Sequence, residues 1–100
     1  MKPSVTIGMP VYNGEKYLRE SIDSILSQTY ADFELCISDN ASADNTEGIC
    51  REYVDKDSRI KYNRFKENLG ASKNYNFLAK NAVGKYFRWS NHDDLWDETS

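Results

Sequence analysis

The sequence of 100 residues has no long apolar run, and no segment approaches the ~20 consecutive apolar residues that a membrane-spanning helix needs. Residues 1–4 also lack the apolar stretch of a signal peptide, so we expect a protein that is made and kept in the cytoplasm. Glycine and proline are scarce, with 5 and 2 residues, as in an ordinary globular protein of one domain at most. A net charge of −3 with interspersed signs argues against nucleic acid as a partner, because duplex binding usually needs a basic face.

Several patterns that carry chemistry are missing as well. The two cysteines, Cys36 and Cys50, have no metal-type spacing, and we expect reduced thiols, one on a strand and one on a helix. No Gly-x-Gly-x-x-Gly follows the first predicted strand, and no Gly-x-x-x-x-Gly-Lys-Ser/Thr occurs anywhere. If a nucleotide binds, a metal ion and carboxylates must therefore hold its phosphates in place of a glycine loop.

The chain does contain a regular alternation of predicted strands and helices. Short apolar runs predict strands over residues 5–9, 33–38, 59–65 and 86–90, the first of them ended by Pro10. Helical periodicity predicts helices over residues 15–27, 46–56 and 71–82. Their expected buried faces are Leu18, Ile22, Ile25 and Leu26 in the first helix, Ile49, Tyr53 and Val54 in the second, and Tyr75, Leu78, Ala79 and Ala82 in the third.

The order β-α-β-α-β-α-β predicts an α/β protein with a mainly parallel sheet and right-handed crossovers. Ligands of such sheets collect at the carboxyl ends of the strands, near the point where the strand order reverses. Four stretches are expected there on one side of the sheet: residues 10–14, 38–44, 66–73 and 91–94.

These stretches contain side chains that suit a nucleotide, although each has a simpler interpretation. Tyr12 offers an aromatic face for a base, or is a core or surface tyrosine. Asp39 can accept hydrogen bonds from a base N–H or a ribose hydroxyl, or only begins a turn. Lys73, near a helix N-terminus that favours anions, and Arg64 can supply positive charge to a diphosphate, or are surface cations.

Asp93 and Asp94 follow the last predicted strand directly. Oxygen-only ligands suit a hard cation such as Mg²⁺ or Mn²⁺, which would hold substrate phosphates. The alternative is a pair of solvated acids that cap the next turn, as is common for aspartate. Neighbours on an extended chain point to opposite faces, so one metal ligand and one structural partner are easier to build than an acid/base pair.

Five blocks of the sequence, in this order and spacing, resemble family 2 glycosyltransferases of the GT-A fold. They are Val-Thr-Ile-Gly-Met-Pro-Val-Tyr-Asn at 5–13, Leu-x-x-x-Ile-x-Ser-Ile-x-x-Gln-Thr-Tyr at 18–30, a block at 33–44 that ends in Asp-Asn-Ala-Ser-x-Asp, Asn-x-Gly-x-Ser-Lys-Asn at 68–74, and a block at 84–96 that ends in Asn-His-Asp-Asp-x-Trp. The resemblance covers essentially the whole chain. It implies a Rossmann-like, three-layer α/β/α architecture, a nucleotide-diphosphate sugar, usually a UDP-sugar, as donor, and Mn²⁺ or Mg²⁺ as cofactor.

By position, the resemblance implies a nucleotide-sugar site made of Pro10, Tyr12, Glu15, Asp39, Arg64, Lys73 and Asn91. The first three are expected around the base and ribose, Asp39 at the uracil or ribose, and Arg64 and Lys73 near the base or diphosphate. Asp93 would be the metal-facing acid of the family's Asp-x-Asp motif. Two positions depart from the family: Asn91 replaces the first acid and loses a charge, and Lys73 stands where arginine is frequent.

Family members continue well past this motif, so we expect residues 1–100 to be the N-terminal donor-binding part of a glycosyltransferase domain. The acceptor half, with the catalytic base for inverting transfer to a glycan or lipid-linked acceptor, is expected beyond residue 100. We therefore expect residues 1–100 to bind nucleotide weakly and to catalyse no transfer alone. Other expected partners are a membrane, contacted peripherally by the full-length protein, and a second copy of the chain, because a missing half leaves a sheet edge exposed.

A second interpretation is a non-catalytic nucleotide-binding or interaction module with a degenerate site, which Asn91 favours. A phospho-accepting receiver domain also alternates strands and helices. It needs acids after the first strand and a lone aspartate after the third, and this chain has neither.

Overall fold

Four parallel strands form one sheet in the order β3-β2-β1-β4, and three helices connect them. The computed structural model describes residues 5–28, 32–82 and 86–90. The elements are β1 (Val5–Val11), α1 (Leu18–Gln28), β2 (Phe33–Asp39), α2 (Thr46–Lys56), β3 (Ile60–Arg64), α3 (Ala71–Lys80) and β4 (Tyr86–Trp89). The predicted order of elements and the parallel sheet are confirmed.

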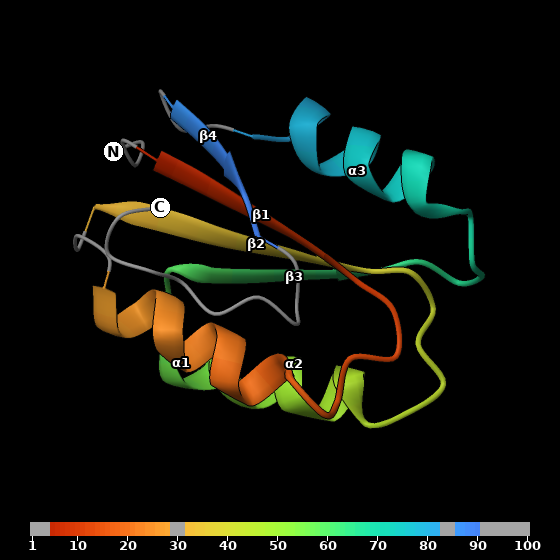
Figure 1. Ribbon diagram of the computed structural model, residues 1–100, viewed down its shortest axis with the longest axis horizontal. Coiled ribbons are helices and arrows are strands. Elements are labelled where there is room, and N and C mark those ends of the chain that lie inside the picture. The colour runs from red at the N-terminus through yellow and green to blue at the C-terminus, as the bar shows by residue number, and fades with distance from the viewer. Residues whose placement is uncertain (1–4, 29–31, 83–85, 91–100) are drawn as a thin grey trace.

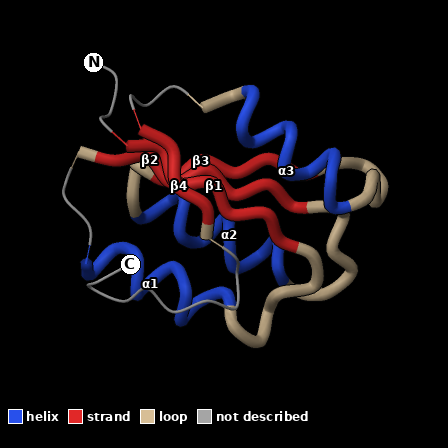
Figure 2. The backbone as a smooth tube through the Cα atoms, turned by 45° about the horizontal axis from the view of Figure 1, so that its top comes forward, coloured by secondary structure: helices blue, strands red, loops and turns tan. Residues whose placement is uncertain are grey.

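The helices cover both faces of the sheet, which gives the predicted three layers. Helices α1 and α2 lie on one face and α3 lies on the other (Figure 1). The chain moves from β1 outward to β3, and α3 then carries it back past β1 to β4, so the strand order reverses beside β1. The loops after β1, β2 and β3 leave the same end of the sheet (Figure 2), as parallel strands require.

The main core lies between the sheet and the pair of helices α1 and α2. The predicted face of α1 is confirmed, because Leu18, Ile22 and Ile25 are fully buried and Leu26 packs against them. Strand residues such as Met9 complete the cluster from the sheet. Each fully buried side chain of this size contributes about 1.5–3 kcal/mol relative to an exposed one. No helix in the described part of the chain is long and apolar enough to span a membrane.

The predicted buried face of α3 is wrong in part. Leu78 is buried as expected, but the other buried residue is Asn74, while Ala79 is exposed and Tyr75 only half-buried. The Nδ2 group of Asn74 donates a hydrogen bond of 3.0 Å to the backbone carbonyl of Ser38. A pattern of apolar residues does not mark this asparagine as buried, because its burial depends on a partner in another element.

Several predicted boundaries also differ from the structure, and two of them bear on the loop after β1. Strand β1 does not end before Pro10 but continues to Val11. The carbonyl of Gly8 accepts the Ser90 N–H at 2.8 Å, so the backbone polar groups of Gly8 point toward β4. The backbone of Pro10, two residues on, points the same way, but it lies past Gly8 and Trp89, the last described pair of the two strands. Proline is tolerated there because no ladder bond in the described part of the sheet needs its missing N–H.

Helix α1 begins at Leu18, three residues later than the predicted start at Glu15. Residues 15–17 form a turn instead, in which the backbone N–H of Tyr17 donates to the carbonyl of Gly14 at 3.0 Å. This turn leaves Glu15 in the loop after β1, at the carboxyl end of the sheet.

Candidate nucleotide site at the carboxyl ends of the strands

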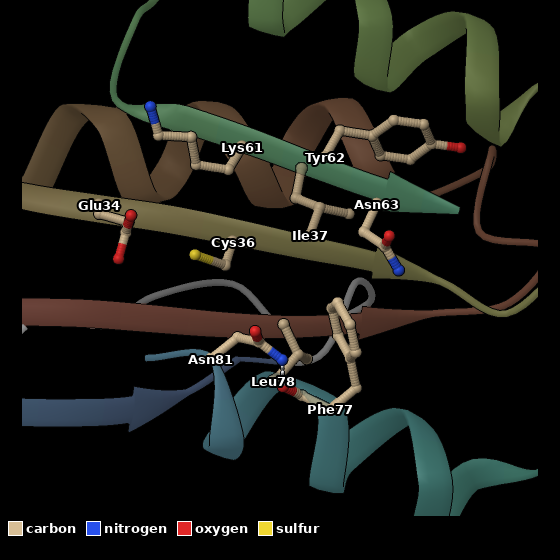
Figure 3. A pocket seen from close by; sticks show the side chains of 9 residues that line it. All are labelled: Glu34, Cys36, Ile37, Lys61, Tyr62, Asn63, Phe77, Leu78 and Asn81. Carbon is tan, nitrogen blue, oxygen red and sulfur yellow. Dashed lines mark hydrogen bonds between the residues drawn. The ribbon is translucent and has the colours of Figure 1, made fainter. Parts of the chain in front are cut away.

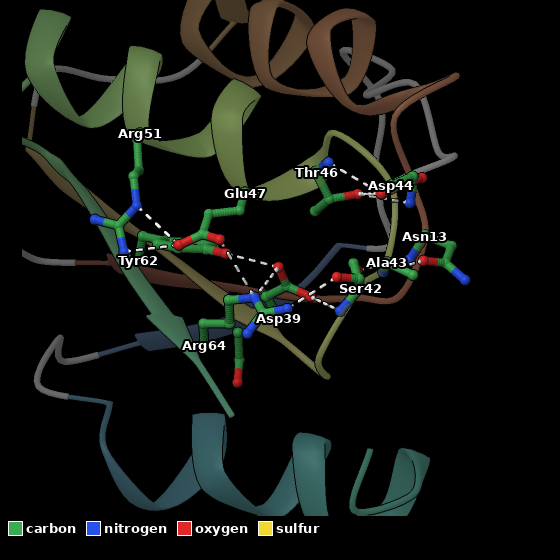
Figure 4. Close-up of polar contacts among 12 residues, drawn as sticks. Asn13, Asp39, Ser42, Ala43, Asp44, Thr46, Glu47, Arg51, Tyr62 and Arg64 are labelled. Atoms are coloured by element: carbon green, nitrogen blue, oxygen red, sulfur yellow. Dashed lines mark hydrogen bonds and ion pairs between the residues drawn. The ribbon is translucent and has the colours of Figure 1, made fainter. Parts of the chain in front are cut away.

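The loops after β1 and β2 are joined by hydrogen bonds between backbone and side chains (Figure 4). The backbone N–H of Asn13 donates to Oγ of Ser42 at 2.7 Å, and the N–H of Ala43 donates to Oδ1 of Asn13 at 2.8 Å. One residue further, the N–H of Gly14 donates to the buried Oγ1 of Thr46 at 2.9 Å. The two loops, about 30 residues apart in the sequence, therefore form one polar wall.

Asp44 and Glu15 extend this junction to the start of α2. The N–H of Glu15 donates to Asp44 Oδ2 at 3.2 Å, and the N–H of Asn45 donates to Glu15 Oε2 at 3.2 Å. Asp44 also accepts the N–H of Thr46 at 2.9 Å. Desolvation raises the pKa of the Asp44 carboxyl, but the hydrogen bonds from Thr46 and Glu15 outweigh it and leave the pKa below its ordinary value.

Asn40 ties the loop after β3 to the same wall. Its Oδ1 accepts the N–H of Leu69 at 2.8 Å, and its Nδ2 donates to Oδ1 of Asn68 at 2.9 Å. The same Asn68 oxygen accepts the N–H of Gly70 at 2.8 Å, directly before α3. All three loops at the carboxyl ends of β1, β2 and β3 are thus held in one hydrogen-bonded network.

Two non-glycine residues of these loops have positive φ angles. Asn13 has φ 51°, which asparagine tolerates well, but Ala41 has φ 62°. An alanine in this region costs about 1 kcal/mol or more, so the surrounding hydrogen bonds must hold it there. Strain of this kind is concentrated in binding and catalytic loops, where a fixed geometry matters more than local stability.

Asp39, the last residue of β2, is the buried centre of the network. Its side chain is 0% exposed. Oδ1 accepts the backbone N–H of Ser42 at 2.9 Å, and Oδ2 accepts the Tyr62 hydroxyl at 2.6 Å. Burial, followed by the hydrogen bond to Asp39, raises the pKa of the Tyr62 hydroxyl far above its ordinary value. Tyr62 therefore stays a neutral donor, and Asp39 is held by donors on both oxygens.

Arg64 lies beside Asp39 on β3, its partner in the strand register. Its Nη2 donates to the carbonyl of Ser42 at 3.0 Å, and its Nε lies 3.8 Å from Asp39 Oδ2 and 3.7 Å from Glu47 Oε1. Glu47 in turn accepts two hydrogen bonds from Arg51 on α2. The guanidinium of Arg64 therefore braces the loop that begins at Asp39 (Figure 4).

The other predicted site residues are placed as follows. Tyr12 stands just past β1 with 47% of its surface exposed, and Pro10 is buried in β1. Lys73 is exposed in the first turn of α3. Asn91 and Asp93 lie outside the described residues. Among the residues that are described, no group of three His, Cys, Asp or Glu side chains is arranged to hold a metal ion.

The residues that hold the loops together were not among the predicted site residues: they are Asn13, Asn40, Ser42, Thr46 and Tyr62. The clusters of small polar residues after two strands were a signal for the first four, because such side chains bond to nearby backbone groups. For Tyr62 the signal was weaker. Tyr62 and Arg64 share one face of β3 by the period of two, but only the register shows that this face meets Asp39.

A cavity of about 240 Å³ lies on the opposite face of the sheet, beneath α3 (Figure 3). Apolar side chains of Phe77 and Leu78 line it together with Asn63, Asn81 and the thiol of Cys36. Burial, with a smaller effect of Glu34, raises the pKa of this thiol to about 12. The thiol is therefore protonated near neutral pH and is a poor nucleophile. Both cysteines are free, on a strand and a helix, as predicted.

Comparisons with known proteins agree with this geometry. Residues 6–100 match the family model described as glycosyl transferase family 2. An uncharacterized glycosyltransferase of Rickettsia typhi is 47% identical over 94 residues, which make up 94% of this chain and 28% of that protein.

Two solved structures have the same fold over nearly the whole chain. S. aureus TarS in complex with UDP-GlcNAc superposes with a TM-score of 0.85 and 30% identity, over 98% of this chain and 28% of that one. A mannosyltransferase from Pyrobaculum calidifontis in complex with GDP-Man and Mn²⁺ superposes with a TM-score of 0.85 and 26% identity, over 96% of this chain and 29% of that one. The chain thus spans less than a third of the length of these proteins.

Proposed function

The chain belongs to glycosyl transferase family 2, and we propose that it forms the nucleotide-sugar-binding part of an enzyme that transfers a sugar from a UDP-sugar to a glycan or lipid-linked acceptor. Its fold is the Rossmann-like GT-A fold of the glycosyltransferases that it matches. The proposal extends to inversion at the sugar carbon, with the catalytic base beyond residue 100. It also extends to a role in polysaccharide biosynthesis, in the cytoplasm and with peripheral membrane contact.

The observation that carries the proposal is the network that joins the three loops at the carboxyl ends of the strands. It holds Asp39 through a hydrogen bond to each carboxylate oxygen. It also holds Asn13, which directly follows the exposed Tyr12 in the chain. These bonds fix the loops to one another, and loops that are already fixed lose less conformational entropy when a ligand binds.

Each predicted site residue has a role in this proposal. Tyr12 stacks against the base, while Pro10 and Glu15 shape the wall around the base and ribose. Asp39 accepts a hydrogen bond from a base N–H or a ribose hydroxyl once the neighbours that leave its side chain 0% exposed give way. Arg64 and Lys73 supply positive charge that offsets the negative charge of the donor, Lys73 from the first turn of α3. The main role of Arg64 is to hold the loop through its hydrogen bond to the Ser42 carbonyl.

Asn91 and Asp93 follow β4 in the sequence, and we propose that they belong to the same site. Their side chains offer oxygen donors only, a set that suits Mn²⁺ or Mg²⁺. Asp93 would be the charged ligand and Asn91 a neutral oxygen ligand or a ribose contact. A divalent cation bound there would offset the charge that develops on the departing nucleoside diphosphate.

Calorimetric titration of UDP into the protein, first with Mn²⁺ and then with EDTA, tests the proposal. We expect binding that depends on the metal and that Asp93→Ala abolishes. Binding that ignores the metal would restrict the site to base and ribose contacts. The absence of binding with UDP and with GDP in both conditions would contradict the proposed function.

The competing function is a non-catalytic nucleotide-binding module, which the replacement of the first motif acid by Asn91 favours. Hydrolysis or transfer assays on the full-length protein with common UDP- and GDP-sugars separate the two. We expect turnover by the full-length protein and none by residues 1–100 alone. Nucleotide binding without turnover of any donor would support the module instead.

A further inference from the structure

We propose that Tyr62 is a positioning residue of the nucleotide site: its hydroxyl orients the Asp39 carboxylate and, through Asp39, the loop of residues 40–46. This inference rests on the proposed function, because it concerns the same site. Tyr62 itself lies beneath the loop on β3, so it acts through Asp39 and not on a ligand.

Two residues of β3 surround the Asp39 carboxylate. The strand register pairs Ile37 with Tyr62 and Asp39 with Arg64, so both β3 residues flank the carboxylate from one side. The Tyr62 hydroxyl donates to Asp39 Oδ2 at 2.6 Å, a short bond of the kind that an ionised acceptor makes. The side chain of Asp39 is 0% exposed, so removal of the hydroxyl would take one donor from a buried carboxylate oxygen.

Asp39 is in turn linked to the loop. Its other oxygen, Oδ1, accepts the N–H of Ser42 at 2.9 Å and so closes the turn that contains Ala41, with φ 62°. Ser42 then accepts the N–H of Asn13 from the loop after β1 at 2.7 Å. A rotation of the Asp39 carboxylate would therefore be transmitted to both loops, because one hydrogen bond follows directly on the other.

This arrangement limits the chemistry that is left to Asp39. The Tyr62 hydroxyl and the Ser42 N–H both donate to Asp39, and the two oxygens of Asp39 act only as acceptors in these bonds. The remaining lone pairs of Asp39 can only accept, so a ligand group that bonds to them must carry an N–H or O–H, and it must displace the neighbours that leave the side chain 0% exposed. The imide N–H of uracil and the ring N–H of guanine meet this requirement, as do ribose hydroxyls.

A second tyrosine offers a matched control. Tyr53 of α2 donates to Oδ1 of Asp23 on α1 at 2.6 Å, the same bond length as in the Tyr62 pair. Burial, followed by its bond to Asp23, raises the pKa of the Tyr53 hydroxyl to about 12, so this tyrosine is also a neutral donor. Its bond joins two helices and touches none of the three loops. Tyr53→Phe therefore removes a tyrosine–aspartate hydrogen bond of the same length away from the site, although its acceptor Asp23 is exposed and Asp39 is buried.

The test compares Tyr62→Phe with Tyr53→Phe by calorimetric titration with UDP and by thermal unfolding. We expect Tyr62→Phe to weaken UDP binding about tenfold, the value of one hydrogen bond to a charged group. Tyr53→Phe should bind UDP as the wild type does, even with a similar loss of thermal stability. Equal weakening in both variants, or none in Tyr62→Phe, would overturn the inference.

Hydrogen exchange supplies a measurement that does not depend on a ligand. Loss of the Tyr62 hydroxyl should speed exchange of the Ser42 amide about tenfold, while Tyr53→Phe should leave it unchanged. Unchanged Ser42 exchange in a folded Tyr62→Phe protein would refute the inference alone. A wild-type protein that binds neither UDP nor GDP would refute the proposed function, and this inference with it.

Discussion

The two faces of the sheet use alternate residues of the same strands, yet one face is tightly packed and the other is polar and partly hollow. On the face toward α1 and α2, Met9 and Leu35 are completely buried within a continuous apolar cluster. Their chain neighbours on the α3 face, Gly8 and Cys36, are small, and Cys36 lines the cavity beneath α3. The packed face supplies most of the hydrophobic stabilisation of the fold.

The face toward α3 also differs from the packed face in its buried polar atoms. Within the described residues, three buried polar atoms lack a hydrogen-bond partner: Ser38 Oγ, Asn63 Nδ2 and Asn74 Oδ1. All belong to this side of the molecule, since Ser38 pairs with Asn63 in the register and Asn74 bonds the Ser38 carbonyl. Unpaired buried groups cost about 1–3 kcal/mol each. The buried polar atoms without a partner therefore gather beneath α3, whereas Asp39 and Tyr62 share the packed face with Leu35, at its carboxyl end.

The largest effect is expected from adjacent residues on the two faces. Leu35→Ala should lower the free energy of unfolding by about 2–5 kcal/mol, because it opens a cavity in the packed cluster. Cys36→Ala should cost about 1 kcal/mol or less, because its thiol already borders a cavity. Denaturant unfolding of both variants measures the difference. Equal losses would show that the two faces are packed alike.

A smaller effect is expected where the α3 face is crowded. A Cβ added at Gly8 would lie 2.7 Å from Cζ of the Phe87 ring on β4. Gly8→Ala should therefore lower the free energy of unfolding by about 1–3 kcal/mol, the usual cost of overpacking. Combining it with Phe87→Leu should recover part of the loss in chemical denaturation. If the loss of unfolding free energy in the double variant equals the sum of the losses in the two single variants, the clash with Phe87 is not the cause.

The third test concerns Asp44, at the carboxyl edge where the loops meet. Its carboxyl pKa is lowered below 3.8 in the folded state, so its stabilisation is complete above that value and is lost as the pH falls through the folded pKa. Asp44→Asn should cost about 1 kcal/mol at neutral pH, and its difference from the wild type should shrink in acid. Unfolding curves across this range measure it, with the exposed Asp55→Asn as control. A difference that stays constant with pH would exclude the carboxylate as its source.

The smallest effect separates the two thiols. Cys50 is fully buried in the packed cluster, whereas Cys36 is partly exposed at the cavity. Burial is the main cause that raises the pKa of each thiol to about 12, so both should react slowly with a disulfide reagent at about pH 8. Cys36 should nevertheless be modified about tenfold faster, because the reagent can reach it. Mass spectrometry of the labelled sites checks the order, and faster labelling of Cys50 would contradict it.

Much of the fold could be predicted because its signals are local. The apolar stripe of α1 and the alternating strands identify their elements without knowledge of any partner. The prediction was wrong where a tertiary partner decides. Asn74 is buried because a carbonyl on β2 accepts its amide, and Pro10 remains in β1 because it faces the β4 side past the last described pair.

The candidate site, like the fold, could be predicted from the sequence only in part. The positions of the loops at one edge follow from the parallel order of the elements, and small polar residues such as Ser42 and Asp44 are visible in the sequence. The contact of Asp39 with Tyr62 could not be predicted, because it needs the register of β2 with β3. The roles of Asn91 and Asp93 remain predictions, since these residues lie outside the described part of the chain.

By itself, then, the sequence determined the order of strands and helices, the end of the sheet at which polar loops gather, and the family to which the chain belongs. The tertiary structure alone decided that Asp39 is buried between Tyr62 and Ser42, that Arg64 braces the loop, and that one face of the sheet is hollow. The physical reason is range. Periodicity is a property of neighbouring residues, whereas the contacts of Asp39 with Tyr62 and of Arg64 with Ser42 join groups 23 and 22 positions apart, whose meeting depends on register and loop closure.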